Sequence, residues 1–487
     1  MKINKASILQ AKEYYKKNIY LISIILVCYV LGRVENQYNL ELISLLMIFS
    51  WICVFFVRNI NEYYLQCIMM FSFFLFLIDR PLIGFLRGYI WWETYSSTIH
   101  TVLTMIIVLL VAFWCGSLLS KKVTRKTSLK AKKKIDIWDN ILVKRGAILI
   151  CILSMGCKYY VEFRQYMELR TQDYTDMYLG VNLDFPFYIR ILSGISVFLL
   201  AVVLSYDFSK IKSFFFLSIY VLSGSFEFLL GNRTSLMAKI LFAVIYYCIR
   251  HFSASEKEVW FGKIEKILIC VMIPISIIGL GIMNYSRSDE KVEPQSVTGI
   301  VSDFFYKQGT TFDTVCQGIE FKEELREEEI LYTLGPIQDY LNDSTLGQVI
   351  FRTTPMPDGN NLIRATEGHE MAHHLSYLVL GEEYLNGRGR GSSFILEIYM
   401  DFGYIGVAMC AMFLGFFCTE VRNLCKNQYL YVIMLIILTE FFMLTRSSAL
   451  GIVLFVMQPQ FWVMWILLIS LYIIGKILPK SLKEKKN

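Results

Sequence analysis

Two adjacent histidines and a nearby glutamate are the residues of this sequence best suited to proton transfer. His373 and His374 lie in a polar segment, and Glu397 follows on an apolar stretch that begins with two serines. An imidazole or a carboxylate can accept a proton from a hydroxyl group, and a carboxylate within a membrane helix is costly enough to indicate a function. We therefore interpret His374, His373 and Glu397 as the candidate catalytic bases.

Between these residues the run GRGRG, residues 387–391, places Arg388 and Arg390 in a glycine-rich turn. Planar guanidinium groups bind phosphate oxygens through paired hydrogen bonds. Arg233 in the sequence GNRT and Arg446 are expected on the same side of the molecule, so these four arginines are predicted to bind a substrate diphosphate. The alternative is that the arginines only anchor the chain at lipid headgroups.

His369, Glu370 and His373 also form the pattern H-E-x-x-H. On a helix this spacing places two imidazoles on one face, with the glutamate as general base, as in zinc peptidases. A catalytic zinc ion needs a third protein ligand, and His374 would point about 100 degrees away from His373 on a helix. We therefore disfavour a metal site, and no cofactor is expected.

Membrane-spanning helices must position these residues. Of the 487 residues, 55% are hydrophobic and 18% charged, which exceeds an ordinary globular composition and predicts an all-α polytopic membrane protein. No nucleic-acid partner is expected. About twelve apolar runs are long enough to cross a bilayer: 20–34, 40–57, 63–79, 99–119, 142–160, 187–206, 211–230, 235–250, 264–283, 392–418, 429–445 and 449–475.

Lysines set the orientation of these runs, because residues 2–17, 121–134 and 476–487 are lysine-rich and fall on one side when spans alternate. Both termini are therefore predicted to be cytoplasmic. The chain then divides into spans 1–9 (residues 1–283), a large, mainly helical extracytoplasmic loop or cap (284–391) and spans 10–12 (392–487).

Two expectations follow for individual residues. Cys316 lies well inside the extracytoplasmic loop and should react there with an impermeant thiol reagent. Glu227 and Lys239 are each six residues from Arg233, so they lie at similar depth below the GNRT turn and are expected to neutralise one another. That pairing would leave Arg233 available to a ligand.

The sequence GRGRGSSFILEIYMDFGYIG, preceded by HHLSYLVLGEEYLNG, YTLGP and the earlier GNR, resembles the Wzy-type polymerases of bacterial surface polysaccharides. The resemblance implies a GT-C-like glycosyltransferase of the bacterial plasma (inner) membrane. It also implies that oligosaccharide repeat units on undecaprenyl diphosphate serve as donor and acceptor. Membrane lipid, a chain-length regulator and a flippase are the further partners it suggests.

On this basis we expect a metal-independent polymerase that joins lipid-linked repeat units at the outer face of the membrane. A lipid-linked oligosaccharide flippase or exporter is the alternative, and intramembrane charges along a central path would favour it. An outward-facing zinc metalloprotease is the third possibility.

Overall fold

The computed structural model describes residues 5–124, 136–171, 183–230, 232–253, 259–263, 296–326 and 330–477, with a few positions between 265 and 278. Within these ranges every regular element is a helix. This follows from the apolar composition, since a chain in a bilayer must satisfy its backbone hydrogen bonds internally.

The first part of the bundle contains α1 (Lys5–Val34), α2 (Tyr38–Arg58), α3 (Ile60–Phe73), the π-helical η1 (Phe74–Ile78), α4 (Asp79–Leu86), the short η2 (Glu93–Tyr95), α5 (Ile99–Thr124), α6 (Asp136–Asp139), α7 (Ile141–Leu169), α8 (Phe187–Gly194), α9 (Ser196–Leu204), α10 (Lys210–Ser223), α11 (Ser225–Leu229) and α12 (Arg233–Ser253). The cap helices follow as α14 (Val297–Gln308), α15 (Thr310–Glu320), α16 (Lys322–Arg326), α17 (Gly335–Asp343), α18 (Thr345–Phe351), α19 (Leu362–Thr366), α20 (Met371–Leu380) and α21 (Glu382–Leu385). The bundle ends with α22 (Phe394–Leu424), α23 (Gln428–Glu440), the 3-10 helices η4 (Phe441–Arg446) and η5 (Gly451–Val456), and α24 (Pro459–Ile477).

Nine stretches of the described chain are long and apolar enough to cross a membrane, and each overlaps one of the twelve predicted spans: Tyr38–Arg58, Ile60–Leu86, Ile99–Ser120, Phe187–Leu204, Lys210–Leu229, Thr234–Phe252, Phe394–Leu424, Gln428–Arg446 and Pro459–Ile477. Residues 20–34 form a shorter apolar helix at the end of α1. Residues 142–160 lie in α7, which is helical but carries three basic residues in that range. Most of 264–283 falls outside the described residues.

The predicted start of the last span at residue 449 is wrong. The chain from Gly451 to Val456 is a short 3-10 helix, and the membrane helix begins at Pro459. Proline lacks the N–H that a helix interior needs but fits the first helical turn, so it starts α24 here rather than lying within a longer helix.

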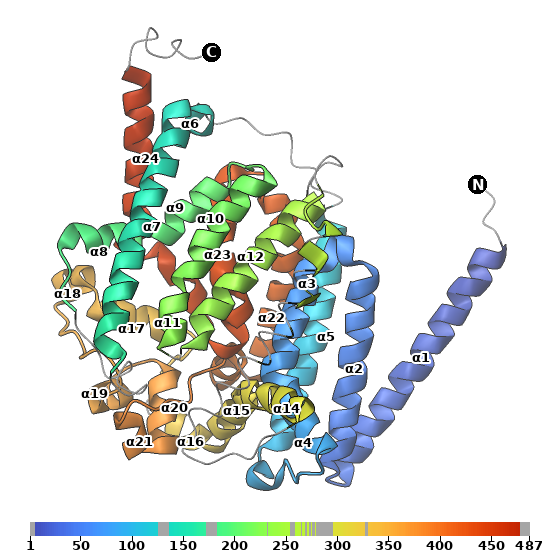
Figure 1. Cartoon of the computed structure of the whole chain (residues 1–487). Helices are drawn as coiled ribbons and strands as arrows, with labels where there is room; N and C mark the ends of the chain where they lie inside the picture. Colours follow the sequence, from blue (N-terminus) through green and yellow to red (C-terminus); the bar gives the residue numbers. More distant parts are fainter. Residues whose placement is uncertain are drawn as a thin grey trace.

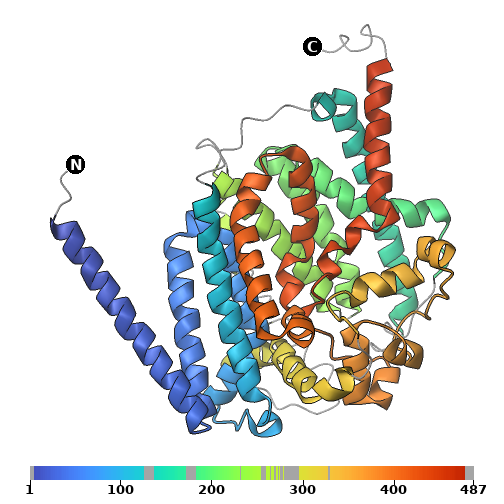
Figure 2. The same cartoon turned by 180° about the vertical axis from the view of Figure 1, so that it is seen from behind.

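The tightest helix pair joins α5 to α22 through two glycines. A methyl group on Gly116 would lie 1.9 Å from the Met412 carbonyl oxygen, and one on Gly415 would lie 2.0 Å from that of Phe113. The two backbones can approach this closely only because both positions lack a side chain. Figure 2 shows α22, in orange, running beside α5.

The cap helices α14 to α21 gather at one end of the bundle, while the Lys5 end of α1 and the Ile477 end of α24 lie at the other (Figure 1). The cap shares the bundle's hydrophobic core, because Phe312, Cys316 and Leu375 belong to the same cluster of buried side chains. Cys316 is fully buried, and burial raises the pKa of its thiol well above the ordinary value. The expectation that Cys316 reacts with an external reagent is therefore wrong, because the cap packs that face against the bundle.

Candidate active site

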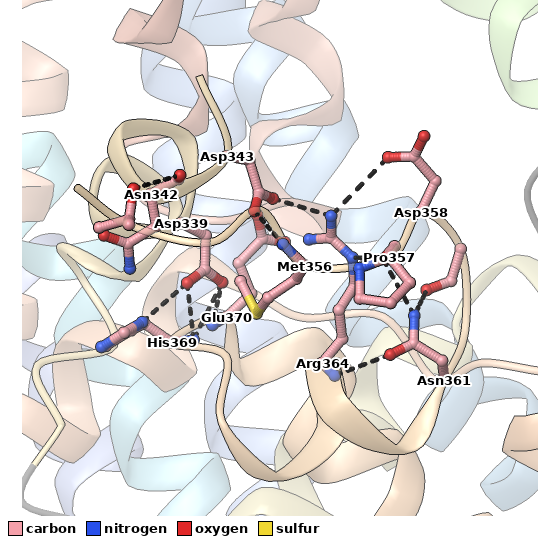
Figure 3. A network of polar contacts seen from close by, with 12 residues as sticks. Asp339, Asn342, Asp343, Met356, Pro357, Asp358, Asn361, Arg364, His369 and Glu370 are labelled. Atoms are coloured by element: carbon pink, nitrogen blue, oxygen red, sulfur yellow. Dashed lines mark hydrogen bonds and ion pairs between the residues drawn. The ribbon is translucent and has the colours of Figure 1, made fainter. Parts of the chain in front are cut away.

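A buried aspartate holds the start of α20, the helix that carries both candidate histidines. Asp339 is 2% exposed, and its two oxygens accept hydrogen bonds from the backbone nitrogens of His369 and Glu370 at 2.9 to 3.1 Å. Its Oδ1 also lies 2.7 Å from His369 Nδ1 (Figure 3). A carboxylate at a helix N-terminus satisfies unpaired N–H groups and complements the helix dipole, so Asp339 fixes where α20 begins.

This placement breaks up the H-E-x-x-H pattern. Glu370 is the N-cap residue of α20, with extended backbone angles, and His369 precedes it. His369 and His373 therefore do not share a helical face, which the zinc-peptidase geometry requires. Among the described residues, no group of three or more His, Cys, Asp or Glu side chains is placed to hold a metal ion.

The hydrogen-bond partners of His373 favour one of its two tautomers. Its Nδ1 lies 2.9 Å from the Tyr384 hydroxyl oxygen, and that hydroxyl donates its own hydrogen to the Asn361 carbonyl at 3.3 Å. With the hydroxyl hydrogen assigned to Asn361, the hydroxyl accepts from the ring, and on this assignment Nδ1 carries the proton and Nε2 the lone pair. Burial lowers the pKa of His373 to about 4, with Arg364 adding to the effect, so the imidazole is neutral at physiological pH.

His374 has the same arrangement deeper in the cap. Its Nδ1 lies 3.1 Å from the hydroxyl oxygen of Tyr332, which donates to the Leu325 carbonyl at 2.9 Å. His374 is 4% exposed, whereas His373 is half-buried. Of the two histidines, His373 is therefore the more accessible to a substrate.

The loop that carries the two arginines is held by its backbone. Arg390 N donates to the Ser376 hydroxyl at 2.9 Å, and Arg390 O accepts from Thr314 at 3.2 Å, which ties the loop to α20 and α15. Both guanidinium groups are exposed, and that of Arg388 forms a 2.9 Å ion pair with Glu383 at the surface. An exposed ion pair is weak, so Glu383 leaves Arg388 able to bind another anion.

Glu397 lies in the first turn of α22 and is 1% exposed. Its Oε1 accepts from the Ser392 hydroxyl at 2.6 Å and its Oε2 from Ala449 N at 2.8 Å, while Ser393 Oγ donates to Thr445 O at 2.8 Å. These bonds join the arginine loop to the non-helical stretch between η4 and η5. With both oxygens engaged, we interpret Glu397 as a residue that positions the loop.

The YTLGP motif is held by Asp401 on α22. The Asp401 carboxylate accepts from Tyr332 N at 3.1 Å and from Thr333 N at 2.7 Å, and also from the Thr333 hydroxyl. Two residues further on, Gly403 has φ +60° and ψ −156°, which breaks the helical geometry inside α22. Asp401 thus connects the turn that orients Tyr332, and through it His374, to the first part of α22.

The other predicted phosphate ligands are less well defined. Arg446 is exposed at the end of η4, and the side chain of Arg233, at the start of α12, lies outside what the structure describes. Two further arginines support the fold: Arg80 pairs with Asp313 at 2.6 Å, and Arg364 pairs with Asp343 at 2.8 Å, the second of these pairs being drawn in Figure 3. Of the four predicted phosphate ligands, Arg388 and Arg390 lie in the loop that is hydrogen-bonded to α20 through Ser376.

The structure corrects one expected ion pair and adds two residues that the sequence analysis missed. Lys239 does not pair with Glu227: its Nζ lies 3.3 Å from Glu162 Oε1 on α7 and 2.9 Å from Ser223 Oγ. Equal depth on neighbouring helices does not fix which way the side chains point, and α7 offers the closer carboxylate. The sequence also gave no signal for Tyr384 or Asp339, whose roles depend on contacts between distant segments.

These features define a class: a polytopic membrane protein with a polar site of tyrosine-bonded histidines and exposed arginines within a helical cap at one end of its bundle. Residues 17–479 match the family model described as O-antigen polysaccharide polymerase Wzy, and the chain belongs to that family. It is accordingly a multi-pass membrane protein of polysaccharide biosynthesis. No curated protein and no solved structure matches it.

Proposed function

We propose that this chain is a GT-C-type glycosyltransferase that joins oligosaccharide repeat units carried on undecaprenyl diphosphate. The proposed reaction takes place under the cap, at the outer face of the bacterial plasma membrane, with the termini in the cytoplasm. Donor and acceptor are both lipid-linked, and no metal takes part. The Wzy family match over nearly the whole chain supports the reaction class.

In the proposed step, a hydroxyl of the new unit attacks the anomeric carbon of the growing chain. The bond from that carbon to the diphosphate oxygen breaks with inversion, and the lipid diphosphate leaves. The hydroxyl proton passes to His373 Nε2, the lone-pair nitrogen in this structure. Arg388 and Arg390 stabilise the negative charge that develops on the departing diphosphate.

The single observation that carries this proposal is the pair of tyrosine-held histidines beside the arginine loop. A neutral imidazole with a fixed tautomer suits general base catalysis, and guanidinium groups suit a diphosphate leaving group. Ser376 of α20 connects the two directly, because its hydroxyl accepts from Arg390 N. A diphosphate leaves as a stable anion, so its departure depends on cations that stabilise its charge rather than on an acid that protonates it.

The test uses cells that lack this chain and are complemented with variants. We expect His373→Ala to leave single repeat units on the cell surface without polymer, because delivery of the unit is separate from joining. Retention of units inside the cell would instead identify a flippase. Stoichiometric zinc in the purified protein, with activity lost on chelation and restored by zinc, would overturn the metal-independent mechanism.

A further inference from the structure

A second group of ionisable side chains lies away from the cap, inside the bundle. Glu162 on α7 accepts from two lysines through one oxygen, at 3.2 Å from Lys158 and 3.3 Å from Lys239. Glu227 on α11 and Glu440 at the end of α23 interact electrostatically with Lys239. Five ionisable residues from four helices thus meet within segments that are apolar enough to span a membrane or lie beside them.

The two membrane spans that carry Glu227 and Glu440 are each interrupted next to this cluster. The span Lys210–Leu229 breaks at Gly224, between α10 and α11, and the span Gln428–Arg446 changes from α-helix to 3-10 helix directly after Glu440. A methyl group on Gly224 would lie 3.1 Å from Lys239 Cδ, so the missing side chain at this position lets the lysine pass close to the end of α10. Interrupted membrane helices that carry charges are the usual construction of substrate sites inside bundles.

The cluster has carboxylate oxygens to spare. Glu162 is 4% exposed, yet its Oε2 has no hydrogen-bond partner among the described residues. Within the same described part of the chain, neither Glu227 nor Glu440 has a basic side chain at ion-pair distance. Glu440 is exposed although it lies inside a stretch apolar enough to span a membrane, and carboxylates at such positions almost always face the bundle interior or a water-filled cavity.

We propose that this cluster binds the sugar hydroxyl groups of a lipid-linked repeat unit within the bundle. Three carboxylates against two ammonium groups would repel a phosphate, whereas hydroxyl groups donate to carboxylates and accept from ammonium groups. The ring of Tyr220, 5.7 Å from Lys239 Nζ, adds an apolar face of the kind that sugar rings pack against. This inference rests on the proposed function, because that function brings a saccharide to the bundle.

The test measures binding of two probes to the purified full-length chain in nanodiscs. One probe is the lipid-linked repeat unit extracted from cells that lack this chain, and the other is undecaprenyl diphosphate without sugar. Glu440→Gln and Glu227→Gln are expected to weaken binding of the sugar-bearing lipid about tenfold, the loss of one charge-assisted hydrogen bond. Binding of the sugar-free lipid should not change. Glu35→Gln, at an exposed position between α1 and α2, is the matched control.

Three other outcomes overturn the proposal. Equal weakening for both probes would place the diphosphate at the cluster, and unchanged binding of both would make the cluster purely structural. Sugar binding that requires sodium ions and is lost with the carboxylates would indicate a cation site. The Glu440 side chain makes no hydrogen bond to the described residues, so Glu440→Gln is expected to spare the fold, which thermal unfolding can verify. A wild-type chain that binds the sugar-bearing lipid but joins no units would refute the polymerase and leave the sugar site standing.

Discussion

The contact between His373 and Tyr384 makes the proposed base testable through a double-mutant cycle. Replacing Tyr384 by phenylalanine removes the hydroxyl that holds Nδ1 at 2.9 Å and keeps the ring otherwise unchanged. If the tyrosine acts only by orienting His373, Tyr384→Phe should slow polymerisation in the wild-type background. The same substitution should have no effect once His373 is alanine.

The sizes of these effects follow from the geometry. A neutral hydrogen bond contributes about 1 kcal/mol, so Tyr384→Phe is expected to lower the rate about fivefold. His373→Ala removes a general base, which costs about 10²- to 10⁴-fold. The double variant should therefore match His373→Ala alone, rather than falling a further fivefold.

The assay follows polymer length and amount from lipid-linked units in purified membranes, with thermal unfolding measured in parallel. Equal fivefold losses in both backgrounds would show that Tyr384 acts independently of His373, for example by holding Asn361. Normal polymer from His373→Ala would refute the assignment of the base itself. The matched tyrosine, Tyr332 beside His374, provides a second cycle in which the smaller exposure of His374 predicts a smaller rate effect.

Four further predictions concern the loop, pH, the bundle and the metal. Arg390→Lys and Arg388→Lys each keep the charge but lose the planar fork, which should raise the barrier by ~2 to 4 kcal/mol; near-normal polymer from either would mean headgroup anchoring only. Because burial lowers the pKa of His373 to about 4, the base stays unprotonated as pH falls to 5.5, so the rate there should be close to that at 7.5; an acid limb near 6.5 would contradict this. Gly415→Leu should destabilise the purified protein by about 1 to 3 kcal/mol through overpacking against Phe113, and an unchanged unfolding midpoint would argue against the close helix contact. His369→Ala should keep polymerisation within about fivefold of wild type, because the backbone nitrogens of His369 and Glu370 still hold Asp339. The wild-type protein should also stay active in a strong chelator. Loss of activity both in His369→Ala and on chelation would indicate a metal site.

The sequence was informative where a single segment decides the outcome. Apolar length placed nine of the twelve expected spans, because bilayer thickness sets a minimum helix length. It failed at Pro459, since hydropathy cannot distinguish a proline inside a helix from one that starts it. The ends of the membrane helices were therefore predictable to within a few residues, except where a proline at the start of a helix sets the boundary.

The site depended more on contacts between distant segments. Residue types and their spacing in the sequence pointed to His373 and to the arginine loop, but they did not identify the residues that hydrogen-bond to either of them. Tyr332 is 42 residues from His374, and Glu162 is 77 residues from Lys239, so no periodic pattern relates them. Side-chain direction around a helix axis decides such pairs, and one sequence does not fix how neighbouring helices are rotated.

The kink at Gly403 lets the single helix α22 make two different sets of contacts. Residues before Gly403 are held by polar contacts, those of Glu397 with Ser392 and Ala449 and that of Asp401 with Thr333, whereas the later part of the helix packs against α5 at Gly415. The φ of +60° at Gly403 is accessible to glycine at little cost, so the helix kinks here without backbone strain. The kink therefore lets the first turns of α22 follow the polar contacts of the site while the later turns keep their close contact with α5, so a residue other than glycine at position 403 would set these two groups of contacts against each other.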